Sequence, residues 1–321
     1  MITLAGRKHR LCGGLERREF LRLGALGLGG LTLADLLRCE ALGANAGRPK
    51  SIIYVVLPGG PSHIDMYDLK PDAPVEYRGP FRPIQTRLSG VQICEMLPLQ
   101  AGIMDQLALL RGICSVENDH YMSEVYTGLP RTAGKRPAFG SVASRLGSTP
   151  SPLPTYVSLR QESDPYDAPH YAGSQHAPFR PFGAVLEDLT PAKSADQLPD
   201  RRNLLRALDS LRRDLDANAF TAVDSFQAKA LDIITSPRVR DAFDLSKEPD
   251  KVVASYGGGK YTHAVAKQYL YDWPAKNFLL ARRLVEAGVR VVTFDAGSWD
   301  HHGTPTTDIF YSLRHQLAAL D

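Results

Sequence analysis

Two apolar runs rich in β-branched residues, each followed at once by a polar loop, constrain the fold of this chain most strongly. The first is SIIYVVL, Ser51–Leu57, and the second is VRVVTFD, Val289–Asp295. A continuous apolar run of this length suits a strand buried on both faces of a parallel sheet. Before the second run, Pro274–Ala287 has a helical pattern, and Gly288 is suited to end that helix. This order is half of a βαβ unit, and it predicts an α/β fold with a mainly parallel sheet sandwiched by helices.

Other segments predict further elements of the same kind. Apolar runs at Gln106–Ser115 and Pro154–Leu159 predict two more strands. The expected short helices are one from Asn118 or Asp119 to Tyr126, which Gly128 would end, and one at Phe139–Ser148.

Prolines recur from residue 149 to residue 199, which disfavours long regular elements there. The aromatic residues of this stretch favour an ordered, loop-rich insertion over a disordered linker. Residues 200–247 are expected to be helical, with leucines on one face packing into the core. SYGGGKYT, Ser255–Thr262, is expected to be a turn, because it has neither the spacing of a phosphate loop nor a strand before it.

The N-terminus has the organisation of an export signal. Residues 1–50 carry nine Lys/Arg against four Asp/Glu, whereas the rest of the chain is slightly acidic and gives no reason to expect a nucleic-acid partner. Paired Arg17 and Arg18 precede the uncharged stretch Leu23–Ala34, which is shorter than the roughly 20 residues of a membrane span. Ala44–Ala46 fits a small-residue cleavage site. We expect residues 1–46 to be a twin-arginine signal peptide, residues 47–321 to form the α/β domain, and the protein to be periplasmic or secreted.

An amphipathic surface helix is the alternative for this segment, although its glycines disfavour a helix. A lipid anchor at Cys39 is disfavoured by Arg38. Removal of the leader would leave Cys94 and Cys114, which either pair in an oxidising compartment or remain as two buried thiols.

Three loops rich in metal-competent side chains follow predicted strands. In an open α/β sheet, ligands bind at the carboxyl ends of strands, so the loops are expected to meet at one rim. Asp and His mixtures suit Zn²⁺ or a similar ion, and a neighbouring serine can act as nucleophile. Each loop alone also fits ordinary helix capping and turn formation. The loops contain Ser62, His63, Asp65 and Asp68; Glu117, Asn118, Asp119, His120 and Ser123; and Asp295, Ser298, Asp300, His301 and His302.

The order of these motifs resembles a known family. LPGGPSHIDMYDLKP, NDHYMSEVYTGLPR and VVTFDAGSWDHHG behind a twin-arginine leader are similar to the secreted bacterial domain-of-unknown-function family fifteen-oh-one, which is assigned to the alkaline phosphatase and sulfatase superfamily. The resemblance implies a site for two metal ions, zinc being expected, and hydrolysis of phosphate or sulfate esters.

Carried onto this chain, the resemblance implies metal binding by Asp65 with His63 and by Asp300 and His302, and nucleophilic attack by Ser62 or Ser123. For a hydrolase of this kind we further expect His63 and His120 to bind metal or the anionic ester, and Arg131 to stabilise the transferring group. On an extended loop Asp300 and His302 would face one way, and His301 would point toward the core or the substrate.

Two departures from the family pattern limit this interpretation. The C/S-x-P-x-R pattern of ordinary sulfatases does not occur in the chain. Family members continue to a further Asp-His loop, whereas this sequence stops in an apolar periodic segment, so we expect the domain to lack its C-terminal part.

The alternative function is a non-catalytic exported protein that binds a glycan or a protein partner through the aromatic residues of the Pro-rich stretch. A cytoplasmic phosphate-sugar mutase of the same superfamily conflicts with the leader.

Overall fold

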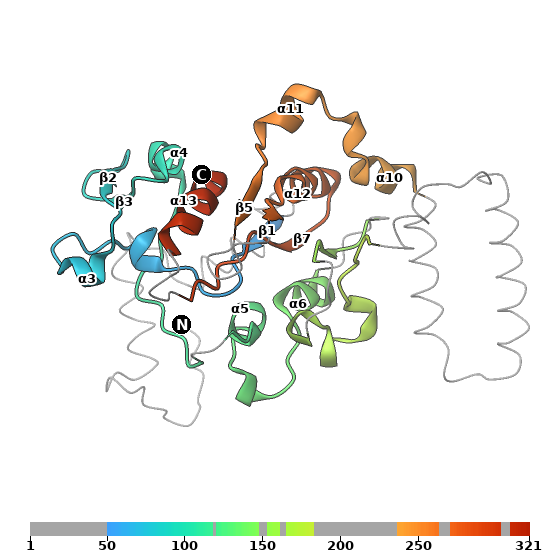
Figure 1. Cartoon of the computed structure of the whole chain (residues 1–321). Helices are drawn as coiled ribbons and strands as arrows, with labels where there is room; N and C mark the ends of the chain where they lie inside the picture. The colour runs from blue at the N-terminus through green and yellow to red at the C-terminus, as the bar shows by residue number, and fades with distance from the viewer. Residues whose placement is uncertain are drawn as a thin grey trace, which may run out of the picture. The chain divides into compact units, whose positions relative to one another are not determined.

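The computed structural model of the chain divides it into two units, Met1–Lys50 and Ser51–Asp321 (Figure 1). The structure describes residues 50–117, 120–147, 153–160, 165–182, 236–262, 270–302 and 309–321. The leader expected at residues 1–46 and most of the helical stretch expected at 200–247 lie outside these ranges. None of the described helices is long and apolar enough to cross a membrane.

A three-stranded parallel sheet forms the centre of the second unit. Its strands are β1 (Ile52–Val56), β7 (Val291–Asp295) and β4 (Tyr156–Ser158), in the order β1-β7-β4. The register pairs Ile52 with Val291 and Tyr156 with Val291 from the other side. The mixed α/β class and the parallel sheet are therefore as predicted.

The central strand is β7, not β1. Four of the five β7 residues are buried, as expected for a strand with a neighbour on each side. In β1, by contrast, Ile52 is 50% exposed and Ile53 is 40% exposed. The prediction that β1 is buried on both faces is wrong, because β1 lies at an edge of the described sheet.

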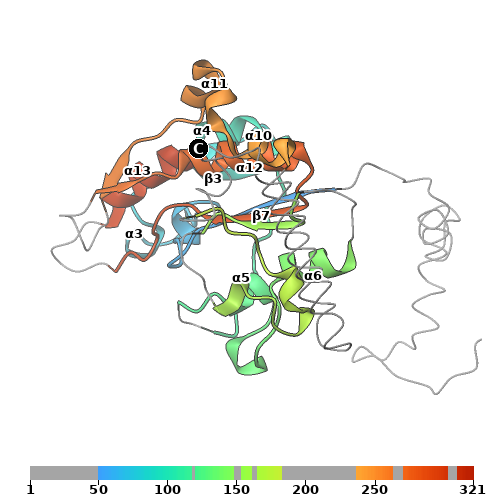
Figure 2. The ribbon, with the colours of Figure 1, turned by 90° about the vertical axis from the view of Figure 1, so that its right-hand side faces the viewer.

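Helices lie on both sides of the strands, with α12 (Ala275–Ala287) on one side and α6 (Phe139–Leu146) on the other (Figure 2). Helix α12 begins after Pro274 and ends at Gly288, whose φ of +112° suits glycine and whose N–H donates to Leu284 and Val285 oxygens. Helix α10 (Pro237–Phe243) packs on α12. The helix and the C-cap predicted from the sequence are confirmed.

The remaining elements are short. The structure has two antiparallel strand pairs and several helices of one to three turns. These elements are β2 (Pro83–Gln85) with β3 (Gln92–Cys94), β5 (Lys260–Thr262) with β6 (Leu270–Asp272), α3 (Val75–Arg78), α4 (Pro98–Gly102), α5 (Ser123–Thr127), α11 (Asp250–Ser255), α13 (Ile309–Leu320), and the 3₁₀ turns η1 (His63–Asp65), η2 (Met104–Gln106), η3 (Arg131–Ala133), η4 (Pro165–Asp167), η5 (His170–Ala172), η6 (Ser174–His176) and η8 (Leu245–Lys247).

The strand predicted at residues 106–115 is not formed. The chain leaves η2 and continues without regular structure to residue 115. Leu110 and Ile113 are 78% and 77% exposed, since no described strand lies beside them to pair with this run. Further on, α5 begins at Ser123 and ends at Gly128, as predicted for its C-terminus. Its N-cap is Met122, not Asn118 or Asp119, which lie outside the described residues.

The Pro-rich stretch contributes to the core through its described parts. It supplies strand β4 and the turns η4 to η6, so it is rich in loops as predicted. Four of its aromatic residues belong to hydrophobic clusters or pack against them, namely Tyr156, Tyr166, Phe179 and Phe182, and Tyr156 is only 1% exposed.

The two described cysteines are both free thiols, Cys94 buried and Cys114 exposed. The disulfide alternative is not formed, and the alternative of two buried thiols holds for Cys94 alone.

Candidate functional site

The loops after β1 and β7 lie against each other at the carboxyl ends of these strands. The Trp299 N–H donates to the Pro58 carbonyl oxygen at 2.8 Å. Gly59 packs so tightly that a Cβ atom built on it would lie 2.3 Å from the Asp300 nitrogen, and its φ of +98° also favours glycine. The first and third polar loops therefore meet, as strand-end placement predicts.

Trp299 and His301 anchor the third loop to the protein interior. Trp299 is fully buried, and its Nε1 donates to the Ala296 oxygen at 2.6 Å. Nε2 of His301 lies 2.9 Å from Nε2 of Gln316 on α13. Successive side chains of an extended loop point in opposite directions. Because His301 points toward Gln316, Asp300 and His302 project together in the other direction.

His120 joins Asp300 and His302 in a three-residue cluster, which we call the His/Asp cluster. One potential ligand atom from each residue lies within 4.8 Å of the others. The Asp300 Oδ1 atom is 3.4 Å from Nε2 of His120 and 2.5 Å from Nε2 of His302. The two imidazole rings stand edge to face, with centroids 5.6 Å apart. Side-chain exposures of 58%, 41% and 69% leave all three groups open to a ligand.

The donor set of the His/Asp cluster fits a zinc-type ion. Two imidazole nitrogens and one carboxylate oxygen form a common catalytic set, which leaves a fourth position open. Ligands bound at about 2.1 Å in tetrahedral geometry lie roughly 3.4 Å apart, and the His120–Asp300 distance of 3.4 Å matches this value. The closer His302–Asp300 contact is that of a direct hydrogen bond.

The structure does not bring His63 and Asp65 into the His/Asp cluster. Asp65 is 4% exposed and accepts a hydrogen bond from the Ser62 hydroxyl at 2.6 Å. Its other oxygen has no hydrogen-bond partner among the described residues and faces Gly79, where an added Cβ would lie 2.4 Å away. Burial raises the pKa of Asp65, with the Ser62 hydrogen bond and His63 opposing the shift. His63 is exposed in the same turn.

Ser123 and Arg131 also lie outside the His/Asp cluster. The Ser123 side chain is buried, and its hydroxyl donates to the Leu129 oxygen at 2.8 Å, an arrangement that stabilises the end of α5. The Arg131 guanidinium lies 3.9 Å from the centre of the Tyr121 ring, and its backbone N–H donates to Glu117 Oε1 at 2.7 Å.

A cavity of about 470 Å³ opens beside the His/Asp cluster, and we call it the β1 cavity. It is lined by β1 from Tyr54 onward and by the segment that carries Glu117, His120 and Glu124. Because His120 both lines the cavity and belongs to the cluster, a molecule in the β1 cavity can reach an ion held there.

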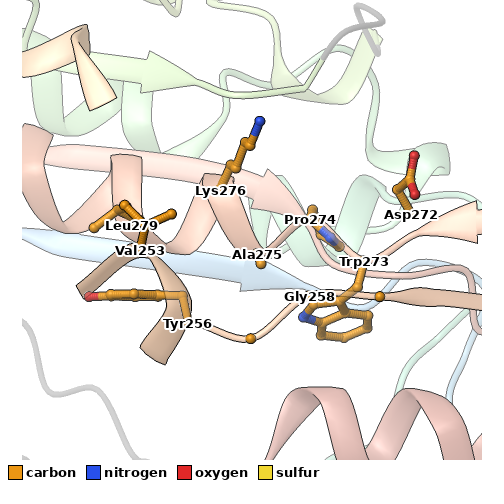
Figure 3. A pocket seen from close by; sticks show the side chains of 11 residues that line it. Val253, Tyr256, Gly258, Asp272, Trp273, Pro274, Ala275, Lys276 and Leu279 are labelled. Atoms are coloured by element: carbon orange, nitrogen blue, oxygen red, sulfur yellow. The ribbon is translucent and has the colours of Figure 1, made fainter. Parts of the chain in front are cut away.

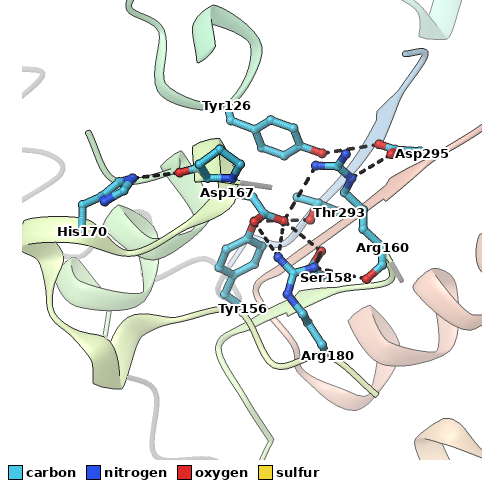
Figure 4. A network of polar contacts seen from close by, with 10 residues as sticks. Tyr126, Tyr156, Ser158, Arg160, Asp167, His170, Arg180, Thr293 and Asp295 are labelled. Carbon is cyan, nitrogen blue, oxygen red and sulfur yellow. Dashed lines mark hydrogen bonds and ion pairs between the residues drawn. The ribbon is translucent and has the colours of Figure 1, made fainter. Parts of the chain in front are cut away.

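A second group of charged residues lies at the ends of β7 and β4 (Figure 4). Arg160 Nε donates to Asp295 Oδ2 at 2.7 Å, and Arg180 Nη2 contacts Asp167 Oδ1 at 2.5 Å. Tyr126 Oη lies 3.5 Å from Asp295 Oδ1, and burial raises the pKa of this tyrosine far above its usual value. These contacts fix the end of β7 and hence the start of the loop that carries Asp300 and His302. Arg160, Asp167 and Arg180 were not predicted from the sequence, although Arg160 directly follows a predicted strand.

A larger cavity of about 590 Å³ lies between the glycine-rich turn and the start of α12 (Figure 3). It is lined by Tyr256, Trp273 and Lys276 among others, and by none of the predicted site residues. Beyond the chain neighbours, none of the described atoms lies within 4 Å of the Cβ positions of Gly257, Gly258 or Gly259, so the turn leaves open space. The turn is shorter than the predicted Ser255–Thr262, because strand β5 already begins at Lys260. Helix α11, not a strand, comes before the glycines, so the exclusion of a phosphate loop stands.

Comparison with known proteins identifies one family. A family model described as "Protein of unknown function (DUF1501)" matches residues 49–321, which include all three polar loops. No curated protein matches the chain, and no solved structure does.

Proposed function

Because the chain belongs to the DUF1501 family, whose function is unknown, we propose from its own residues that it is an exported metal-dependent hydrolase of phosphate or sulfate esters. The observation that carries the proposal is the convergence of His120, Asp300 and His302 beside the β1 cavity. Three accessible donors next to a cavity are what a catalytic metal site requires.

In this proposal the His/Asp cluster holds a divalent cation, zinc being the best fit to its donors. Such an ion polarises the ester oxygen and lowers the pKa of a bound water or hydroxyl. The parallel sheet with helices on both sides supports an alkaline-phosphatase-like fold, and strand-end placement of the polar loops supports it further.

Ser62 is the preferred nucleophile. Its hydroxyl is partly exposed and donates to Asp65, whose raised pKa makes that carboxylate a stronger base for the hydroxyl proton. Attack would form an oxygen–phosphorus or oxygen–sulfur bond, break the bond to the alcohol oxygen and release the protonated alcohol. Water would then release phosphate or sulfate and restore the serine. Ser123 is a poor alternative, because it is buried and bonded to Leu129.

His63 and Arg131 have supporting roles in this scheme. His63 is exposed beside Ser62, and we propose that it binds the anionic ester or a second ion. The Arg131 guanidinium lies over Tyr121, which lines the β1 cavity, so its charge would attract and steady the transferring group.

Location outside the cytoplasm is proposed from the leader sequence alone, with its paired Arg17 and Arg18 before an apolar stretch. Periplasmic or secreted protein is the expected destination, through the twin-arginine translocase.

The alternative function, binding of a glycan or a protein without catalysis, has less support. Its predicted contact surface consisted of aromatic residues in the Pro-rich stretch. Of these, Tyr171 is 66% exposed, whereas Tyr156 is buried and Tyr166, Phe179 and Phe182 are partly buried.

Metal analysis of the purified full chain tests the proposal. We expect the wild-type protein to bind zinc and Asp300→Ala to lose it. His315→Ala is the matched control. His315 is exposed on α13, and its Nδ1 atom lies 2.8 Å from the Tyr311 oxygen of the same helix, away from the His/Asp cluster. His63→Ala shows whether the first loop adds a ligand. Absence of zinc from the wild type, or equal zinc in Asp300→Ala and His315→Ala, would refute the site.

A further inference from the structure

The β1 cavity is lined by both apolar and acidic side chains. Tyr54, Val55 and Val56 of β1 are apolar lining residues. Glu117 and Glu124 also line the cavity, and no lysine or arginine does so in the part of the chain that the structure describes. A cavity of about 470 Å³ has room for a small molecule of up to roughly sugar size.

The two glutamates differ in their partners. Glu124 accepts hydrogen bonds from the Ser115 hydroxyl and from the Val116 and Glu117 N–H groups, and these bonds hold its pKa below the usual value. The Glu117 side chain is only 11% exposed. Its Oε1 atom accepts from the Arg131 N–H and lies 3.9 Å from the Arg131 guanidinium, while its Oε2 atom has no hydrogen-bond partner among the described residues. A buried carboxylate oxygen without a donor gains free energy when a ligand supplies one.

The β1 cavity therefore combines groups of opposite charge. It is lined by His120 of the His/Asp cluster, which becomes positive when it holds a divalent cation, and by the two glutamates. An anionic ester alone would suffer repulsion from the glutamates, whereas a ligand with an anionic and a cationic end would match both.

We infer that the substrate is a monoester of phosphate or sulfate whose alcohol carries a protonated amine, such as an amino alcohol or an amino sugar. The ester group lies toward His120 and the ammonium group toward Glu117 and Glu124. This inference rests on the proposed function, because it takes the ester at the His/Asp cluster for granted. Hydrolysis adds water across the ester bond and yields inorganic phosphate or sulfate and the free amino alcohol.

Two pairs of esters with the same number of non-hydrogen atoms test the inference. The pairs are 2-aminoethyl phosphate with n-propyl phosphate, and 2-aminoethyl sulfate with n-propyl sulfate. Each pair differs by an ammonium group in place of a methyl group. With zinc-loaded full chain, we expect kcat/KM to be at least about tenfold higher for the ammonium member, since a hydrogen bond to a charged group contributes on this scale. The pair that is cleaved also shows whether the enzyme acts on phosphate or on sulfate esters.

Variants locate the origin of the preference. Glu117→Gln and Glu124→Gln each remove one charge with little change of shape, and we expect the ratio of kcat/KM for the ammonium ester to kcat/KM for the propyl ester to fall several-fold in each. Glu76→Gln on α3 is the matched control, since Glu76 is exposed and lies outside the β1 cavity. It should keep the wild-type preference.

The outcomes separate the inference from the proposed function. Cleavage with equal or better kcat/KM for the propyl esters overturns the inference and leaves the hydrolase proposal standing. An ammonium preference that survives both glutamine variants also overturns it. If no ester is cleaved, the hydrolase proposal fails. Binding of the same probes, followed by nuclear magnetic resonance, then decides the inference, and equal affinities for the two members of a pair reject it.

Discussion

Substitution of Gly59 by alanine is the sharpest test of the contact between the β1 loop and Asp300. Gly59 has φ of +98°, and an added Cβ would lie 2.3 Å from the Asp300 nitrogen and 2.8 Å from its Cα. Gly60 is the matched control, because it has φ of +81° but no atom within 4 Å of the Cβ position. Both alanine variants therefore carry the conformational penalty, and only Gly59→Ala adds a clash with backbone.

The expected magnitudes follow from these two terms. A non-glycine residue in the left-handed region costs about 1–2 kcal/mol, and each kcal/mol lowers the melting temperature of a domain of this size by about 2–4 °C. Gly60→Ala should show that loss alone. In Gly59→Ala the Asp300 backbone must also move by about 1 Å to reach an ordinary contact distance. Metal ligands tolerate errors of only about 0.2 Å, so zinc affinity should fall at least about tenfold, or 1.4 kcal/mol.

Calorimetry and competition with a zinc-binding dye measure the two quantities separately. We expect Gly60→Ala to lose thermal stability but keep wild-type zinc affinity, and Gly59→Ala to lose thermal stability and zinc affinity. Equal zinc affinity in the two variants would refute the link between the β1 loop and the His/Asp cluster.

Three further expectations concern the rest of the unit. Asp167→Asn should lower stability by about 1.5–3 kcal/mol in denaturant titration, because the buried Asp167 carboxylate accepts a charge-assisted hydrogen bond from Arg180, whose side chain is 20% exposed; a loss below about 1 kcal/mol would contradict this role. Hydrogen bonds from two arginines hold the pKa of Glu248 below its usual value, so this carboxylate stabilises the fold above about pH 4 and ceases to do so as the pH falls through its folded pKa. The melting temperature of Glu248→Gln should accordingly be lower than that of the wild type at pH 7, and the difference should shrink as the pH falls below about 4; a constant difference would be inconsistent with this. Peptide mapping after alkylation of the folded protein should find Cys114 labelled and Cys94 protected, since Cys94 is buried and burial raises its pKa; labelling of both at one rate would disprove the packing around β3.

Local sequence rules predicted those parts of the fold whose signals are local. Helix α12, its C-cap Gly288 and strand β7 follow one another along the chain, and each has its own periodicity or cap residue. The apolar run at residues 106–115 has the same composition as a strand, but pairing needs a neighbour, and the sequence does not reveal which segment lies beside it.

In the candidate site, too, local features could be predicted from the sequence, and features that depend on the packing of distant segments could not. The spacing of Asp300 and His302 predicted that they project together, because alternation along an extended loop is local. The choice of His120 over His63 as their neighbour depends on how two distant loops pack. Asp65 turns into the interior, where Ser62 supplies a hydrogen bond and Gly79 leaves room for its carboxylate. No local pattern distinguishes such a residue from a metal ligand.

The position of β1 at the margin of the sheet has a practical consequence for handling the protein. Among the described residues no strand pairs with its outer side, and Ile52 and Ile53 are substantially exposed there. An uncovered strand with apolar side chains is a template for association between molecules. We therefore expect the overproduced protein to aggregate into inclusion bodies, and Ile53→Lys to raise the yield of unaggregated protein.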